Sequence, residues 1–186
     1  MQLEAVRSLW VVDRYAAHAM LDKADETART GLTEARRSLR DLRASPLQEL
    51  GLAGALRELS ESAAERCGAS LDLHTPKDMP RLSPTVEQGI YRIAQEALEN
   101  AVRHASASTI MVRLEQRGDR LSLSISDDGQ GADMATLTGT GSDGKRHLGI
   151  LGMRERAELI GGQLTMTSEG GQGTEMRLLA PISEGR

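Results

Sequence analysis

Four polar residues lie on one side of a predicted helix at residues 84–104. Glu96, Asn100, Arg103 and His104 are spaced i, i+4, i+7 and i+8, which places a carboxylate, an amide and two nitrogen bases along one line of the helix. A carboxamide oxygen is a suitable ligand for Mg²⁺, which also keeps waters and phosphate oxygens in its shell. The two basic side chains could then meet phosphate charge. The helix alone leaves open a plain exposed polar flank.

A second candidate group is the segment Asp127-Asp128-Gly129-Gln130-Gly131, which follows a predicted strand. A carboxylate at the end of a strand can accept a hydrogen bond from an exocyclic amine. Gly129 and Gly131 allow the chain to turn and to approach a flat ligand closely. Taken alone, the segment favours an ordinary Asp-Gly turn.

Gly149 and Gly152 open a third candidate group at the start of a predicted helix over 148–161. Backbone N–H groups at a helix N-terminus bind phosphate well. Three basic residues precede them: Lys145, Arg146 and His147. The Gly-Lys-Ser/Thr run of a Walker motif is missing, so the phosphate site is of another kind.

The fourth group is Gly171-Gln172-Gly173-Thr174, in a predicted turn between strands at 163–168 and 174–180. The hydroxyl group of Thr174, at the start of the last predicted strand, could support Asp127 from below. In isolation this segment also fits a plain tight turn.

The elements that position these groups are helices and strands in mixed order. The sequence predicts a strand at 70–74, a helix at 84–104 that begins after the cap residue Ser83, and a hairpin of strands at 109–116 and 120–127. Residues 128–147 hold five glycines and little apolar content, which predicts a long functional loop. The expected fold class is therefore α+β, a mixed sheet with helices on one face.

The first 45 residues have a different pattern. Apolar residues recur at steps of three and four, close to a heptad seam. A seam this narrow favours pairing with a second chain as a helical bundle, and the alternative is a hairpin packed on its own domain. Ser45-Pro46 predicts a break, residues 46–51 a short linker, and residues from 52 to about Gly68 an amphipathic helix.

Composition excludes several classes of function. The chain has 186 residues, a net charge of −4 and three aromatic residues, so nothing indicates binding to nucleic acid. The single cysteine, Cys67, cannot form an internal disulfide, and no cluster has zinc spacing. No apolar run approaches the roughly 20 residues of a membrane span. A cytoplasmic protein is expected.

Together the four groups are far more specific than each is alone. The stretches Gln95-Glu96-Ala97-Leu98-Glu99-Asn100-Ala101, Asp127-x-Gly129-x-Gly131, Gly149-x-x-Gly152-Met153 and Gly171-x-Gly173-Thr174 occur in this order. They resemble the N, G1 and G2 boxes and the closing Gly-Thr element of the GHKL (Bergerat) ATP-binding fold. The finer resemblance is to sensor histidine kinases of the NarX/DesK type, and it covers nearly the whole chain.

The resemblance implies a two-layer α/β sandwich preceded by a helical-hairpin dimerisation segment. It implies partial dimerisation and histidine-phosphotransfer helices at 1–45, a linker at 46–51 and an ATP-binding catalytic domain at 52–186. It also implies ATP and Mg²⁺ as ligands, a response regulator as partner, and a homodimer in the full-length kinase.

Residue roles follow from the same resemblance. Asn100 would hold Mg²⁺, with Glu96 orienting a metal-bound water or accepting a proton. Asp127 would bind the adenine amino group. The residues implied around the base are Gly129, Gly131 and Thr174. Those implied on the phosphate side are Arg103, His104, Gly149, Gly152 and, from an ATP lid at 132–148, Lys145, Arg146 and His147.

One departure concerns the phosphate acceptor. The family carries a His-Asp pair on its first dimerisation helix, and this sequence has none; His18, for example, is followed by Ala19. We therefore expect the C-terminal part of a longer kinase, able to bind ATP but not to phosphorylate itself, with any membrane attachment through upstream segments. The alternatives are a GHKL ATPase, an anti-sigma-type serine kinase, or a regulator-docking module with a vestigial nucleotide site.

Overall fold

The structure, a computed structural model, describes residues 46–131 and 144–182, and the side chains of residues 46–131 and 149–182. The predicted dimerisation helices at 1–45 and residues 132–143 of the predicted lid lie outside the described residues. The elements follow in the order α3 (Pro46–Cys67), β1 (Ser70–His74), α4 (Pro84–His104), β2 (Thr109–Arg117), β3 (Arg120–Asp127), α6 (Gly144–Leu159), β4 (Gln163–Glu169) and β5 (Gly173–Pro181).

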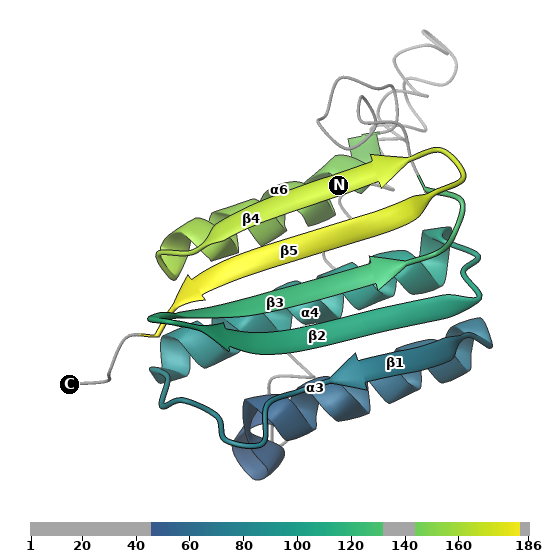
Figure 1. Cartoon of the computed structure of the whole chain (residues 1–186). Coiled ribbons are helices and arrows are strands. Elements are labelled where there is room, and N and C mark those ends of the chain that lie inside the picture. The colour runs from purple at the N-terminus through teal and green to yellow at the C-terminus, as the bar shows by residue number, and fades with distance from the viewer. Residues whose placement is uncertain (1–45, 132–143, 183–186) are drawn as a thin grey trace, which may run out of the picture. The chain divides into compact units, whose positions relative to one another are not determined.

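The described residues form two layers, a twisted five-stranded sheet and three helices that cover one of its faces (Figure 1). The strand order is β1-β2-β3-β5-β4, with β1 and β2 parallel and every other pair antiparallel. Because β3 and β5 pair although α6 and β4 separate them in sequence, the loops after β3 and before β5 meet at one end of the sheet. The predicted α+β sandwich is confirmed.

Helix α4 lies behind the middle of the sheet and has the predicted start. Ser83 accepts a hydrogen bond from the N–H of Val86 at 3.3 Å, and Pro84 occupies the first turn, where its missing N–H does no harm. The apolar stripe of the helix, which includes Ile90, Ile93 and Ala97, is buried against the sheet. This burial fixes which side of α4 faces the sheet.

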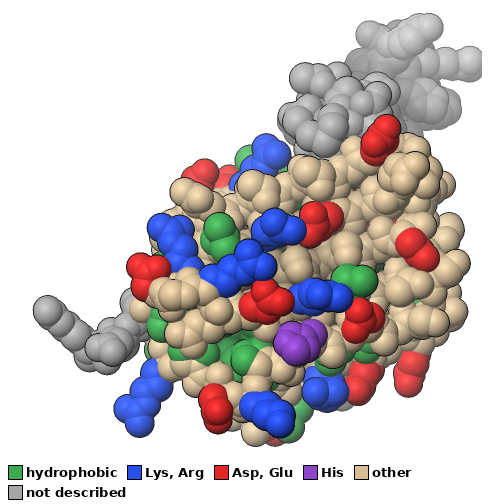
Figure 2. Space-filling view, in the orientation of Figure 1, with side chains coloured by type: hydrophobic (Ala, Val, Ile, Leu, Met, Phe, Trp, Pro, Cys, Tyr) green, Lys and Arg blue, Asp and Glu red, His purple; other side chains and the backbone are tan. Residues whose placement is uncertain are grey.

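Strand alternation determines the two faces of the sheet. In β3, Leu121, Leu123 and Ile125 are buried against the helices, whereas the serines between them lie on the other face. That other face carries no helix of the described chain, and Figure 2 shows basic and acidic side chains interspersed on it. As expected from the composition, the core is aliphatic.

Two element boundaries differ from the prediction. Residues 46–51 were expected to be a linker, but residues 46–50 are helical, and only Gly51, with φ 66° and ψ 176°, interrupts α3. Proline breaks a helix interior yet fits its first turn, and Pro46 takes the second role. Residues 144–147 were expected in the loop, but α6 begins at Gly144, because Lys, Arg, His and Leu there are compatible with helix.

No helix within residues 46–131 and 144–182 combines the length and the apolar character that crossing a bilayer requires.

Candidate nucleotide-binding site

A cavity lies between α4 and the helix-covered face of the sheet, at the end where β3 leads into its loop. From α4 it is lined by Asn100 and His104, which are one turn apart, and by the small residues Ala97 and Ala101. The alanines bring the helix backbone close to the sheet, so the two longer polar side chains border the space beside them. The predicted pair of Asn100 and His104 therefore meets at one cavity.

The sheet supplies the opposite wall. Met166 and Met176 are paired in register across β4 and β5, and Asp127 and Thr174 are paired across β3 and β5. All four line the cavity, together with Ile125. The wall is thus apolar over most of its area, with a carboxylate at one edge, which suits a flat heterocycle that carries an amino group.

The Asp127 carboxylate is about half buried, and this burial raises its pKa from the usual value near 3.8. Backbone hydrogen bonds from Gly129 and Thr174 oppose the shift, and the Gly129 N–H lies 3.0 Å from Oδ1. The neighbouring charge of Asp128 adds to the rise. A carboxylate held in this way is a fixed and partly desolvated hydrogen-bond acceptor.

Thr174 supports Asp127 in a way the sequence did not suggest. Its hydroxyl group lies 2.9 Å from Ser168 Oγ, across the β4–β5 pair, and it is the backbone of Thr174 that bonds to the Asp127 carboxylate. In this structure the hydroxyl group of Thr174 is therefore paired with Ser168, while its backbone contacts Asp127, and the two residues are neighbours in register.

The loop after β3 is held by contacts with the start of β2, with the end of α4 and with the end of β4. Asp128 accepts hydrogen bonds from the N–H groups of Ser108 and Thr109, each at 2.8 Å, which ties the loop to the start of β2. A β-carbon at Gly129 would overlap the carbonyl oxygen of Ala105, and one at Gly131 would overlap that of Glu169. Both glycines are required by close backbone approach, and Gly131 also lines the cavity.

Gly149 and Gly152 were expected at a helix N-terminus, but α6 begins at Gly144, which places them in its second and third turns. A β-carbon at Gly149 would overlap the carboxylate of Glu96, so Glu96 projects from α4 toward the start of α6. The carbonyl of Gly152 accepts a hydrogen bond from Arg156 at 2.9 Å. Lys145, Arg146 and His147 belong to the first turn of α6, and their side chains lie outside the described ones.

Several predicted site residues do not line the cavity: Glu96, Arg103, Gly129, Gly149 and Gly152. Arg103 is engaged in another contact. Its Nε donates to Glu99 at 2.9 Å, and Glu99 also accepts from Arg66 of α3 at 2.8 Å. The hydrogen bond from Arg66 is the main cause that lowers the pKa of Glu99. Arg103 is thus turned toward α3 and does not line the cavity with Asn100.

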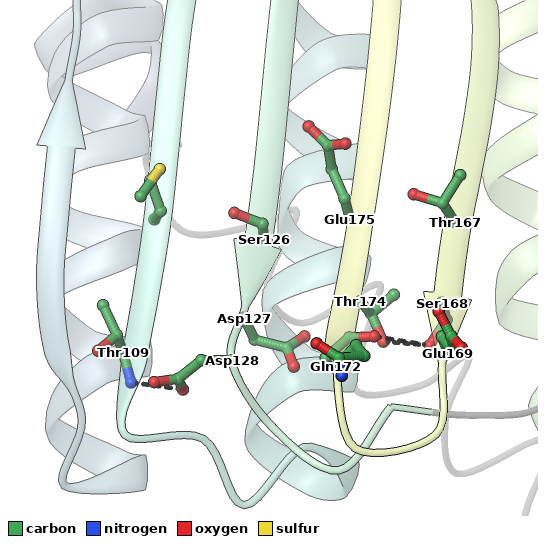
Figure 3. Close-up of a pocket in the computed structure, with 12 residues that line it drawn as sticks. Thr109, Ser126, Asp127, Asp128, Thr167, Ser168, Glu169, Gln172, Thr174 and Glu175 are labelled. Carbon is green, nitrogen blue, oxygen red and sulfur yellow. Dashed lines mark hydrogen bonds between the residues drawn. The ribbon is translucent and has the colours of Figure 1, made fainter.

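A larger hollow of about 590 Å³ lies on the uncovered face of the sheet. Figure 3 shows Ser126, Glu175 and Thr167 side by side on β3, β5 and β4, with Asp127 and Thr174 at its edge. Hydroxyl and carboxylate groups dominate its lining, and the apolar walls that a heterocycle needs are on the helix-covered side. The smaller cavity therefore suits a heterocycle better than this hollow does.

Sequence reasoning did not identify the apolar residues of the cavity: Ile125, Ile150, Met166 and Met176. The signal was present, because each falls on the core side of its element by periodicity. What was missing was the register of β4 against β5, which depends on the turn between them.

That turn gives a testable pair of glycines. Gly173 has φ 79°, and a β-carbon there would overlap the carbonyl oxygen of Asp127, whereas one at Gly170 has no neighbour within 4 Å. Gly173→Ala is expected to lower the free energy of unfolding by about 2–5 kcal/mol, as the sum of backbone strain and overlap. Gly170→Ala is the control and should change it by less than about 0.5 kcal/mol. Urea unfolding measures both, and equal stabilities would contradict the close approach.

Comparison with known proteins agrees with this geometry. Residues 85–184 match the family model described as histidine kinase-, DNA gyrase B-, and HSP90-like ATPase. The chain is 32% identical over 155 residues to the signal transduction histidine-protein kinase/phosphatase DegS of Brevibacillus brevis, covering 83% of this chain and 39% of DegS. It is 33% identical over 145 residues to the oxygen sensor histidine kinase NreB of Staphylococcus carnosus, covering 77% and 40%. The chain therefore spans less than half the length of these curated relatives.

Solved structures show the same fold. The histidine kinase domain of the Erythrobacter litoralis EL346 blue-light activated histidine kinase superposes with a TM-score of 0.58 at 20% identity, over 70% of this chain and 61% of that one. Full-length ShkA in complex with AMPPNP superposes with a TM-score of 0.59 at 20% identity, over 86% and 39%. The family model covers more than half of the chain, and it includes both walls of the cavity. The chain thus belongs to the histidine kinase-, DNA gyrase B- and HSP90-like ATPases.

Proposed function

We propose that this chain is the ATP-binding catalytic part of a sensor histidine kinase, which transfers the γ-phosphate of ATP to a histidine for relay to a response regulator. The observation that carries the proposal is that one cavity joins the Asp127 carboxylate to the Asn100 carboxamide. These two groups, from separate elements of the fold, suit the two ends of a nucleoside triphosphate.

Asp127 provides recognition of the base. Its carboxylate accepts a hydrogen bond from the exocyclic amino group of adenine, while Met166, Met176 and Ile125 cover the ring faces. Guanine presents a carbonyl oxygen at the same position, and two acceptors repel each other. The site therefore favours ATP over GTP.

Asn100 and Glu96 provide the metal side. The Asn100 carboxamide borders the cavity one turn of helix after Glu96, and oxygen donors of these two kinds fit Mg²⁺. When bound, Mg²⁺ supplies neutralisation of the charge on the phosphate groups. Asn100 and Glu96 orient that end of the nucleotide, and Gly149 of α6 lies beside the Glu96 carboxylate.

The phosphate acceptor and the partners belong to the same proposal. The sequence holds no His-Asp pair, so the acceptor imidazole comes from another polypeptide segment. We further propose a response regulator as partner, which fits the relatives named as histidine kinases. A homodimer formed by the helices predicted at 1–45 and a cytoplasmic location for this part belong to the same proposal.

Two measurements test the proposal. Isothermal titration with AMPPNP is expected to show binding that depends on Mg²⁺, and no binding would refute it. Incubation with γ-labelled ATP and a polypeptide that bears the acceptor histidine should give phosphate that is labile in acid. Acid-stable phosphate on a serine would favour the serine kinase instead, and nucleotide binding without any transfer would favour a simple ATPase.

A further inference from the structure

The end of α4 is capped by a residue from a distant loop. The Gln130 side chain donates from Nε2 to the carbonyl oxygen of His104 at 2.6 Å, and its backbone N–H donates to the carbonyl of Ala105 at 2.8 Å. Carbonyl groups at a helix C-terminus have no partner within the helix. Gln130 therefore satisfies two of them at the end of the helix that carries Asn100 and His104.

The same residue is also tied to the sheet. The carbonyl oxygen of Gln130 accepts a hydrogen bond from the N–H of Gly171, in the β4–β5 turn, at 2.8 Å. The residues on either side of Gln130 are closely packed, because Gly129 lies against the backbone of Ala105 and Gly131 against the backbone of Glu169. Gln130 thus links the end of α4 on one side to the turn before Thr174 on the other.

These two attachments lead to the elements that form opposite walls of the cavity: α4 on one side, and on the other the β4–β5 turn, which runs into β5. His104 and Asn100 project from the α4 wall, and Thr174 stands at the start of β5 on the sheet wall. We propose that Gln130 is a positioning residue that fixes the distance between these walls, through its side-chain bond to the carbonyl oxygen of His104, and so keeps the cavity open for the nucleotide base. The proposal rests on the nucleotide binding proposed above, and Gln130 itself is not among the residues that line the cavity.

The chemistry of the bond makes the choice of glutamine testable. The backbone N–H and carbonyl of residue 130 can form their hydrogen bonds to Ala105 and Gly171 with any side chain at that position. A substitution of Gln130 therefore removes or replaces only the side-chain donor. Gln130→Ala removes the donor. Gln130→Glu places an acceptor and a negative charge against a helix C-terminus, where the helix dipole is already negative. Gln130→Lys restores an N–H donor with a favourable charge.

The experiment is titration of the nucleotide-binding chain with AMPPNP and Mg²⁺ at fixed salt. Gln130→Ala is expected to raise the dissociation constant about 3- to 10-fold, as loss of one hydrogen bond implies. Gln130→Glu should raise it further, and Gln130→Lys should return it to within about twofold of wild type. Equal affinities for all four proteins would overturn the proposal.

A matched control separates positioning from general stability. Gln116 also donates its side-chain N–H to a backbone carbonyl, that of Gly118 at 3.1 Å, in the turn at the other end of the sheet. Gln116→Ala is expected to keep the wild-type affinity. If affinity falls only in step with thermal stability, and equally for Gln116→Ala and Gln130→Ala, then Gln130 is merely structural and the proposal is wrong.

A second readout needs no nucleotide. In the nucleotide-free chain, hydrogen exchange at the N–H groups of Gln130 and Gly171 should quicken in Gln130→Ala and Gln130→Glu and be slow again in Gln130→Lys. Unchanged exchange would overturn the proposed link. If the wild-type chain failed to bind AMPPNP, the proposed function would fall, while this exchange measurement would still decide whether Gln130 holds the two walls together.

Discussion

Asn100→Ala is expected to reduce the affinity for Mg²⁺-AMPPNP by at least about 100-fold. Loss of a residue that only orients a metal ligand already reduces metal affinity roughly 10- to 100-fold, and Asn100 is proposed as a ligand itself. Its carboxamide borders the cavity from α4, one turn before His104. Isothermal titration of the chain with AMPPNP and MgCl₂ measures the loss.

The dependence on metal shows whether Asn100 acts through Mg²⁺. With EDTA present, wild type and Asn100→Ala should bind the nucleotide equally weakly, because the contribution of the metal is then absent from both. Asn100→Asp should also lose affinity with Mg²⁺, since its added negative charge repels the phosphates. Unchanged affinity with Mg²⁺ in both variants would remove Asn100 from the site.

Gln88 provides a control on the same helix. It bears the same amide group, is exposed, and lies about three turns before Asn100. Gln88→Ala should leave affinity unchanged, so a loss there would indicate damage to α4 rather than to the metal site.

Most of the fold was predictable because local signals and burial agree. Leu121, Leu123 and Ile125 alternate with serines, and this pattern alone indicates a half-buried strand. Ser83 followed by Pro84 marks the start of α4 to the residue. The errors fell where one residue type has two roles, as Pro46 does, and where glycines made the first turn of α6 resemble a loop.

The site was predictable only in part, because its geometry depends on long-range pairings. Asn100, Asp127 and Thr174 come together as their motifs suggested, since α4, β3 and β5 are adjacent. Arg103 was expected beside Asn100, but Glu99 holds it, and Glu99 is itself paired with Arg66, 33 residues away in sequence. The i, i+4 spacing of Glu99 and Arg103 on α4 was a signal for this pair, whereas periodicity along α4 could not show the contact of Glu99 with Arg66. The chemical roles of all these residues remain predictions.

Asp127→Asn is expected to weaken AMPPNP binding about 10- to 100-fold, the effect of losing a hydrogen bond to a charged acceptor. It should also narrow the preference for adenine over guanine nucleotides, because the amide can present either a donor or an acceptor to the base. Competition between ATP and GTP for the chain measures that preference. Asp119→Asn, in the exposed turn between β2 and β3, removes the same charge far from the cavity and should bind as wild type does.

Asp127→Asn, which is expected to weaken nucleotide binding, should increase the stability of the fold. Burial raises the pKa of Asp127 above its value in the unfolded chain, so the folded state holds the proton more tightly and ionisation opposes folding. The favourable contribution of the protonated group is fully present below the unfolded pKa and is lost as pH rises through the folded pKa. The amide introduced by Asp127→Asn would carry no charge, and its oxygen could still accept from the N–H of Gly129. Thermal unfolding without nucleotide should therefore find Asp127→Asn more stable than wild type at neutral pH, with the difference shrinking in acid. If Asp127→Asn were equally stable or less stable than wild type at neutral pH, burial of the ionised carboxylate would not destabilise the fold. Asp127 would then not be a residue that is kept for binding at a cost in stability.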